Sequence, residues 1–199
     1  MMSNPASAGF GADPDAKTIF TIGHSTRPLE EFVTLLRSCD VVTLADVRTI
    51  PRSRRNPQYA REALEAALAA AGIRYAHLAL LGGLRHARRD SPNGGWRNAS
   101  FRGFADYMQT GDFEEGLVEL RTLAREGTVA VMCAEAVPWR CHRSLLADAL
   151  FARGVVVEHI VGRGRTRPHR LTPFALRVGR QVVYPPPAPG APGADGSAR

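Results

Sequence analysis

A chain of 199 residues, 44% of them hydrophobic, can bury a substantial core, and a single domain is expected at this length. Three cysteines are too few for a disulfide framework, so we expect a reducing, cytoplasmic compartment. The formal net charge is +7, and every basic residue except Lys17 is an arginine, whose planar guanidinium suits phosphate and carboxylate groups. This charge fits a small anionic or phosphate-bearing ligand and a nucleic acid equally well.

The two ends of the chain differ in composition from its middle. Residues 1–16 contain no cationic stretch followed by an apolar one, so we predict no signal peptide. The longest apolar runs are far shorter than the roughly 20 residues that cross a bilayer, so we predict no membrane segment. Residues 1–16 and 185–199 are rich in small residues and proline, which predicts two disordered tails around a single α/β domain at 17–184. The oligomeric state stays open.

The first half of this domain alternates short apolar runs with helical patterns. TIFTIGHS is a predicted strand that starts at Thr18, and Pro28 lies in the first turn of the helix that follows. VVTLADVR is a second predicted strand. Asn56-Pro57 resembles an N-cap and first helical residue, and Gly72 ends that helix. IRYAHLAL is the third predicted strand.

The second half continues the alternation. A helical region spans 100–125 and is expected to break near Gly111, before the predicted strand TVAVMC. CHRSLLADALFARG is a helix that Gly154 ends, and VVVEHIV is a fifth strand. ALRVGRQVVY predicts a small hairpin that turns at Gly179-Arg180.

Strands of consecutive apolar residues that alternate with helices are typical of a parallel sheet covered on both faces. We therefore predict a doubly wound, three-layer α/β sandwich, flavodoxin- or Rossmann-like, with a mostly parallel five-stranded sheet and a small C-terminal hairpin. Ligands of such sheets bind outside the carboxyl ends of the strands. No Walker or G-x-G-x-x-G motif follows the first strand, so we expect no ATP or NAD and predict no cofactor.

Reactive and charged side chains follow three of the predicted strands, which places them at one edge of the sheet. There they could perform proton or thiol chemistry on a bound anion. The predicted catalytic residues are His24, Asp46, Cys133 and Glu135, and the predicted binding residues are Ser25, Arg48, Arg52, Arg54, Trp96, Cys141, His142 and Arg143.

Two loops at this edge are unusual. Residues 81–99 form a connection far longer than the roughly 2–6 residues that usually join a strand to a helix, and Trp96 favours an ordered lid. The loop RTIPRSRRNP places Arg52 and Arg54 just before a predicted helix N-terminus, where guanidinium groups and the helix dipole attract the same anion. A solvated basic loop is the alternative.

The stretch VMCAEAVPWRCHRSLLADAL admits several interpretations. Cys133 is either a small buried hydrophobe or a thiol whose thiolate is favoured by a helix N-terminus and arginines. Glu135 would act as an acid or base, or hold an arginine. His142 leads the apolar face of the helix, so a core histidine is an alternative. A cation at Arg143 opposes the helix dipole unless it pairs with a carboxylate or a bound anion.

Spacing tests three sharper identities for the cysteines. In the phosphatase loop an arginine stands at a fixed distance after the cysteine, but from Cys133 that position holds Trp139 and from Cys141 it holds Ala147. A structural zinc site needs four Cys or His ligands, so His24 would have to complete the set, and we predict no metal. A C-x-x-C motif is absent, but Cys133 and Cys141 could form a reversible disulfide.

Six segments together carry a family resemblance. They are TIGHSTRPLEEF, ADVRTIPRSRRNPQY, GIRYAHLALLGGLR, GWRNASFRGFADYM, CAEAVPWRCHRSLLADAL and RPHRLTPFA, in this order between Thr18 and Ala175. The set resembles the domain of unknown function 488 family. The resemblance implies an α/β domain whose site is formed by the TIGHS and CAE…CHR segments. It implies no reaction, and it links such proteins to nucleic-acid processing by association only.

The leading hypothesis is an enzyme, or a former enzyme, that acts on a small anionic or nucleotide-like substrate. One alternative is an arginine-rich nucleic-acid-binding module. Another is a thiol redox sensor based on Cys133 and Cys141.

Overall fold

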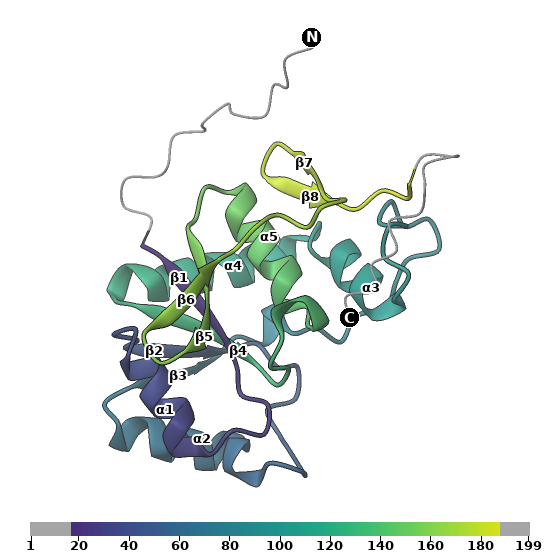
Figure 1. Cartoon of the computed structure of the whole chain (residues 1–199). Coiled ribbons are helices and arrows are strands. Elements are labelled where there is room, and N and C mark those ends of the chain that lie inside the picture. The colour runs from purple at the N-terminus through teal and green to yellow at the C-terminus, as the bar shows by residue number, and fades with distance from the viewer. Residues whose placement is uncertain (1–16, 188–199) are drawn as a thin grey trace.

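The structure of the protein is a computed structural model in which residues 17–187 are described, so the predicted tails lie outside the described residues except for 185–187. Its centre is a six-stranded sheet in the order β3-β2-β4-β1-β5-β6 (Figure 1). The strands are β1 (Ile19–Gly23), β2 (Thr43–Asp46), β3 (Arg74–His77), β4 (Val129–Cys133), β5 (Val157–Gly162) and β6 (Arg165–Pro168). Strands β1 to β5 are parallel, and β6 pairs antiparallel with β5.

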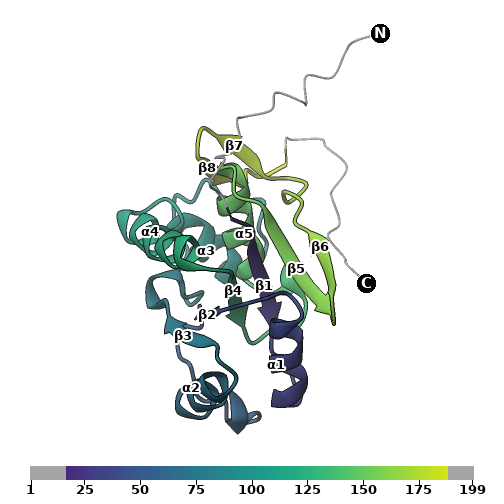
Figure 2. The same cartoon turned by 90° about the vertical axis from the view of Figure 1, so that its left-hand side faces the viewer.

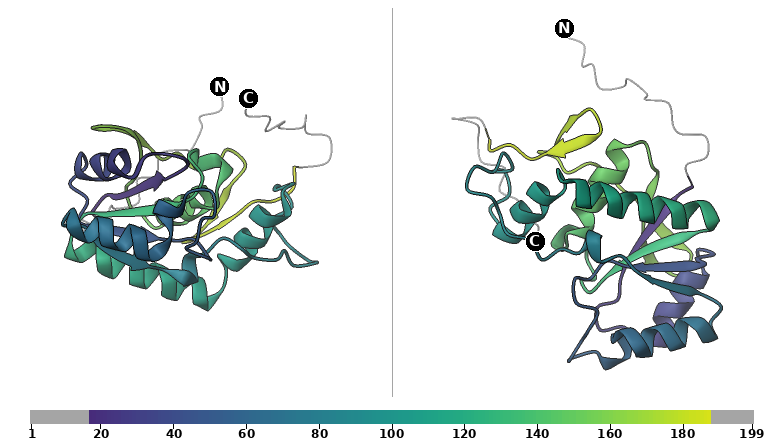
Figure 3. Two further views of the ribbon diagram at one scale, coloured as in Figure 1. Left: turned by 90° about the horizontal axis from the view of Figure 1, so that it is seen from below. Right: turned by 180° about the vertical axis from the view of Figure 1, so that it is seen from behind.

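Helices cover both faces of this sheet (Figures 1 and 2). Helices α1 (Leu29–Arg37) and α2 (Arg61–Ala70) pack on one face, and α3 (Ala99–Tyr107), α4 (Gly111–Glu126) and α5 (Arg143–Ala152) pack on the other. Three short 3-10 turns, η1 (Pro57–Tyr59), η2 (Ala79–Leu81) and η3 (Pro138–Arg140), lie in the loops. The right-hand view of Figure 3 shows the teal helix α4 on the face opposite the two blue helices. Two apolar cores result, one on each side of the sheet.

The α/β class, the mostly parallel sheet and the hairpin are confirmed. The hairpin consists of β7 (Leu176–Val178) and β8 (Gln181–Val183), and Gly179 turns it with φ +61°. The sheet has six strands where five were predicted. Strand β6 has the sequence RTRP and lacks an apolar pattern, because it lies at the antiparallel edge and only one of its sides is paired.

The start of the second helix also differs from the prediction. Asn56 makes no side-chain capping bond, and Asn56-Pro57 opens the 3-10 turn η1. Helix α2 begins only at Arg61, with Ala60 as its N-cap residue. The pattern therefore located a turn correctly but assigned it to the wrong kind of helix.

The order of the connections creates a crevice at one edge of the sheet. The chain passes along one face from β1 to β3, and along the other face from β3 to β5. Strands β2 and β4 are neighbours, so the connections that follow them leave towards opposite faces. Ligand sites of open α/β sheets lie at such a point. No helix within residues 17–187 is long and apolar enough to cross a membrane.

A buried carboxylate fastens the last part of the domain to helix α5. Asp148 is fully buried and accepts hydrogen bonds from His169 Nε2 (2.9 Å) and the Tyr184 hydroxyl (2.8 Å). It also accepts bonds from the Thr172 hydroxyl (2.6 Å) and the Thr172 backbone N–H (3.0 Å). The RPHRLTPFA segment is thus accounted for structurally, because its histidine and threonine bind this carboxylate.

Replacing Asp148 with alanine is expected to destabilise the protein by roughly 3–5 kcal/mol, because several buried donors lose their acceptor at about 1–3 kcal/mol each. Urea denaturation measures the change. Asp90→Ala, at an exposed carboxylate, is the matched control and should leave the free energy of unfolding unchanged. Equal stabilities of the two variants would contradict this role of Asp148.

Candidate active site

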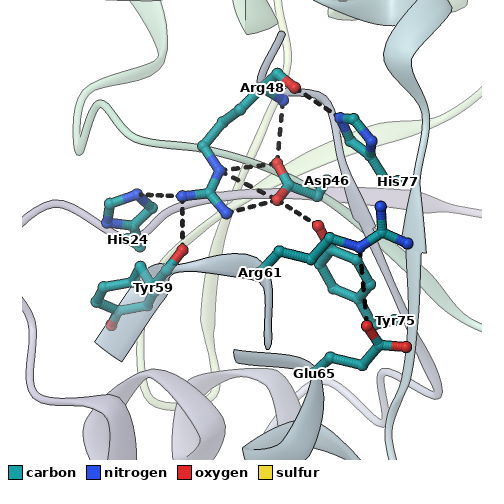
Figure 4. Close-up of polar contacts among 8 residues, drawn as sticks. All are labelled: His24, Asp46, Arg48, Tyr59, Arg61, Glu65, Tyr75 and His77. Atoms are coloured by element: carbon teal, nitrogen blue, oxygen red, sulfur yellow. Dashed lines mark hydrogen bonds and ion pairs between the residues drawn. The ribbon is translucent and has the colours of Figure 1, made fainter. Parts of the chain in front are cut away.

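A buried ion pair lies at the carboxyl end of β2. The Arg48 guanidinium binds the Asp46 carboxylate with an Nη2–Oδ2 distance of 2.6 Å and an Nε–Oδ1 distance of 2.9 Å (Figure 4). The Tyr75 hydroxyl donates to Asp46 Oδ2 at 2.8 Å, and Arg48 Nη1 donates to the Tyr59 carbonyl at 2.9 Å. His77 Nε2 lies 2.8 Å from the Arg48 carbonyl oxygen. The pair therefore joins β2, β3 and the turn η1.

His24 extends this network from β1. Its ring stacks on Tyr59 with centroids 4.0 Å apart, and its Nδ1 lies 2.8 Å from the Ser25 carbonyl oxygen. Burial lowers the pKa of His24 to about 4, and the charge of Arg48 acts in the same direction; the hydrogen bond to the Ser25 carbonyl raises this pKa but does not offset burial. The ring is therefore neutral at pH 7. A carbonyl only accepts, so Nδ1 carries the proton and Nε2 faces Arg48 Nη1 at 3.5 Å as an acceptor.

The GHS segment is fastened directly to the CAE segment. The His24 N–H donates to the Cys133 carbonyl at 3.1 Å, and the Ser25 N–H donates to the Ala134 carbonyl at 2.8 Å. A Cβ on Gly23 would collide with the carbonyl oxygen of Glu135, so only glycine allows the two segments to approach this closely. These contacts explain why the two signatures occur together in one site.

Two free thiols lie side by side where β4 joins α5. Cys133 Sγ and Cys141 Sγ are 2.7 Å apart, and both residues are buried. The Arg143 N–H points to Cys141 Sγ at 3.5 Å, and His142 Nδ1 lies 3.5 Å from the same sulfur. The N-terminus of α5 therefore lies against the thiol pair.

The environment makes the two thiols unequal. Burial raises the pKa of Cys133, but the hydrogen bond from Cys141 and the charge of Arg143 outweigh it, so the pKa of Cys133 is lowered. The hydrogen bond to Cys133, followed by burial, raises the pKa of Cys141. Cys133 is thus the more acidic thiol of the pair, and Cys141 is placed to donate its S–H to it.

The thiols lie on the floor of a cleft of about 460 Å³. Cys133, Cys141 and His142 line it from β4 and the start of α5, and Glu135 lines it from the intervening loop. Its cationic lining comes from Arg48, Arg52 and Arg140, and its apolar lining includes Ile50, Leu84 and Phe101. Arg52 and Arg140 are exposed, so their side chains are open to solvent.

The structure separates the predicted residues into three groups. The first group lines the cleft and consists of Cys133, Glu135, Arg48, Arg52, Cys141 and His142. The second group, His24, Asp46 and Arg143, is buried and does not line the cleft. The third group, Ser25 and Arg54, is not buried and does not line the cleft either.

Trp96 packs away from the cleft in the long loop that was predicted to be a lid. Its ring stacks on Phe101 at 4.9 Å and contacts Phe174 at 4.9 Å and Tyr184 at 5.4 Å. The loop is also held by Asn93, whose side-chain oxygen accepts from the Tyr184 N–H. Residues 81–99 therefore form an anchored wall, which reaches the cleft through Gly83, Leu84 and Asn98.

The sequence analysis missed several residues of the site. Tyr59, Tyr75 and His77 support the ion pair, and Arg140 lines the cleft. Tyr75 and His77 alternate along a strand, which would have placed both on one face, but polar residues at a strand end are common in such sheets. Nothing in the sequence pattern distinguishes Tyr59 from a core aromatic.

No group of three His, Cys, Asp or Glu side chains suited to a metal ion is present between residues 17 and 187. Fold and site together define an α/β protein with a dithiol floor and an arginine-bordered cleft at the carboxyl edge of its sheet. A family model, Domain of unknown function DUF488, matches residues 28–150, more than half of the chain, and the protein belongs to this family. The matched range includes Asp46, Arg48 and the thiol pair. No curated protein and no solved structure matches the chain.

Burial lowers the pKa of His24, and also those of His142 and His159, to about 4. Between pH 6.5 and 4 the unfolded chain binds protons that the native state does not, so stability should fall as pH falls through this range. His24→Gln should make this decline shallower, as measured by urea unfolding at a series of pH values. An unchanged slope in the variant would show that His24 does not contribute.

Proposed function

We propose that the protein is an enzyme that uses Cys133 as a nucleophile on a small anionic or nucleotide-like substrate bound in the cleft. The observation that carries the proposal is the thiol pair on the floor of a cleft that exposed arginines border. A lowered pKa and an adjacent proton donor activate a thiol for attack.

The arginines supply the affinity for an anion. Arg52 and Arg140 have exposed guanidinium groups that can form bidentate bonds to phosphate or carboxylate. Arg48 is committed to Asp46 and the Tyr59 carbonyl, so it contributes a fixed orientation and charge. The apolar wall of Ile50, Leu84 and Phe101 fits the uncharged part of such a substrate.

Glu135 is the residue best placed to transfer protons in the cleft, because it is exposed and lies two residues from the nucleophile. In the proposed reaction, Cys133 Sγ forms a bond to an electrophilic atom of the substrate. The leaving group departs with the bonding electrons and takes its proton from solvent. Water then displaces the sulfur, and the Glu135 carboxylate accepts the proton of that water.

Thiol redox chemistry is the second candidate, which the 2.7 Å separation of the two sulfurs favours. A small disulfide would react with the Cys133 thiolate to give a mixed disulfide and one free thiol. Cys141 would then displace the second thiol and form a Cys133–Cys141 disulfide, so that two protein thiols are oxidised and one small disulfide is reduced.

Location and partner follow the same reasoning. All three cysteines are free, which supports the proposed reducing, cytoplasmic location. The cleft arginines surround one hollow, which supports a small ligand over a nucleic acid. A nucleic-acid partner would instead show binding that weakens steeply as salt is raised.

The nucleophile assignment can be tested with a panel of phosphate esters, acyl phosphates, thioesters and nucleotides, with turnover followed by mass spectrometry. Cys133→Ser should abolish turnover of the substrate that is found, and Glu135→Gln should slow it about 10²- to 10⁴-fold. Cys39→Ser, at a thiol outside the cleft, should leave turnover unchanged. Full activity of Cys133→Ser would disprove the assignment.

The same samples separate the two candidates after treatment with oxidised glutathione. Redox chemistry predicts a peptide pair linked between Cys133 and Cys141, which the Cys141→Ser variant should lack. Free thiols at both positions after oxidation would rule out the second candidate and leave the first intact.

A further inference from the structure

Arg143 is a buried cation without a carboxylate partner. It is 1% exposed, and its Nη2 donates to the backbone carbonyls of Glu135 (3.1 Å) and Ala136 (3.3 Å). Its Nε and Nη1 are buried and have no hydrogen-bond acceptor in the described structure. Among residues 17–187, no acidic side chain forms an ion pair with it.

Such a cation requires a compensating negative charge. Transfer of a guanidinium from water to the interior is unfavourable unless it is paired, and the first turn of α5 adds the positive end of a helix dipole. Asp46 is committed to Arg48, and the side chain of Glu135 is exposed. Neither of these two carboxylates is therefore the partner of Arg143.

The thiol of Cys133 is the remaining candidate for this charge. Cys133 Sγ lies 3.7 Å from the Glu135 carbonyl oxygen, and Arg143 Nη2 lies 3.1 Å from the same oxygen, so the two groups converge on one atom. Ionisation of this sulfur would place an anion beside the guanidinium. Cys141 would then donate its S–H to the thiolate across 2.7 Å.

We propose that Cys133, ionised as a thiolate, is the buried counter-ion of Arg143, and that Arg143 thereby keeps the nucleophile of the proposed enzyme charged at neutral pH. This inference rests on the proposed function, in which Cys133 attacks the substrate. Arg143 does not line the cleft, so it is a positioning residue that acts through the sulfur and not on the substrate.

The surrounding titratable groups agree with an unbalanced positive charge. After burial, the charge of Arg143 is among the causes that lower the pKa of His24, His142 and His159 to about 4. These rings are neutral at pH 7 and supply no compensating charge. The charged and titratable groups around Cys133 are Arg143, Cys141 and Glu135.

The test measures the ionisation of Cys133 directly and needs no substrate. In a Cys39→Ser background, the rate of alkylation by iodoacetamide is followed across pH, with the modified peptide identified by mass spectrometry. Loss of the opposite charge in Arg143→Met should raise the pKa of Cys133 by about one to three pH units. Alkylation at pH 7 should therefore slow about tenfold or more.

Two further variants separate charge from packing. Arg143→Lys keeps the charge and should keep the wild-type pH profile. Arg153→Met removes another largely buried arginine, at the far end of α5 and paired with Glu114, and should leave the profile unchanged. If Arg143→Met does not fold, a folded Arg143→Lys whose Cys133 titrates as an ordinary thiol overturns the inference.

The outcomes for the inference and for the proposed function differ. One outcome is that Arg143→Met leaves the pH profile unchanged while Cys133 of the native chain ionises at a pH well below that of Cys39. This outcome would refute the ion pair and leave the nucleophile assignment standing. A wild-type Cys133 that ionises no more readily than Cys39 would refute both.

Discussion

The buried ion pair between Asp46 and Arg48 is the constraint on which the geometry of the site depends. Removing either partner would leave an uncompensated charge in the interior, which is far more costly than the net worth of the intact pair. The pair is also satisfied on all sides, because Tyr75 donates to the carboxylate and the guanidinium donates to the Tyr59 carbonyl. It thereby joins β2, β3 and the turn η1 (Figure 4), and Arg48 itself lines the cleft.

A second layer of constraint comes from the backbone. Strand β4 lies between β1 and β2, so the CAE segment emerges beside both the GHS segment and the ion pair. Two backbone hydrogen bonds and a glycine at position 23 bring the first pair of segments into contact. As a result, His24, Asp46 and Arg143 are buried at this edge of the sheet, and the two thiols line the cleft. This arrangement favours supporting roles for His24 and Asp46 and chemical roles for the residues that line the cleft.

Much of this arrangement follows from the sequence. Consecutive apolar strands predicted a parallel sheet, and the carboxyl edge of a parallel sheet is where the ends of β1, β2 and β4 had to meet. The sequence could not show which of the predicted residues are buried and which line the cleft. The burial of His24 and Arg143 depends on strand order and on contacts between distant segments. Strand β6 was missed because an edge strand needs no apolar pattern. The sequence also could not show the packing of Trp96, because a loop aromatic gives no sign of whether it faces a ligand or the core.

The central claim is that Cys133 is a reactive thiolate in a cleft that attracts anions. The most direct measurement compares the alkylation rates of the native chain by iodoacetate, which is anionic, and iodoacetamide, which is neutral, at each cysteine. Cys39 serves as the internal reference, because the nearby carboxylates of Asp40 and Glu158 do not attract an anionic reagent. The account predicts that the ratio of the iodoacetate rate to the iodoacetamide rate is higher at Cys133 than at Cys39, and that added salt reduces the difference. Equal ratios at the two cysteines would contradict the account.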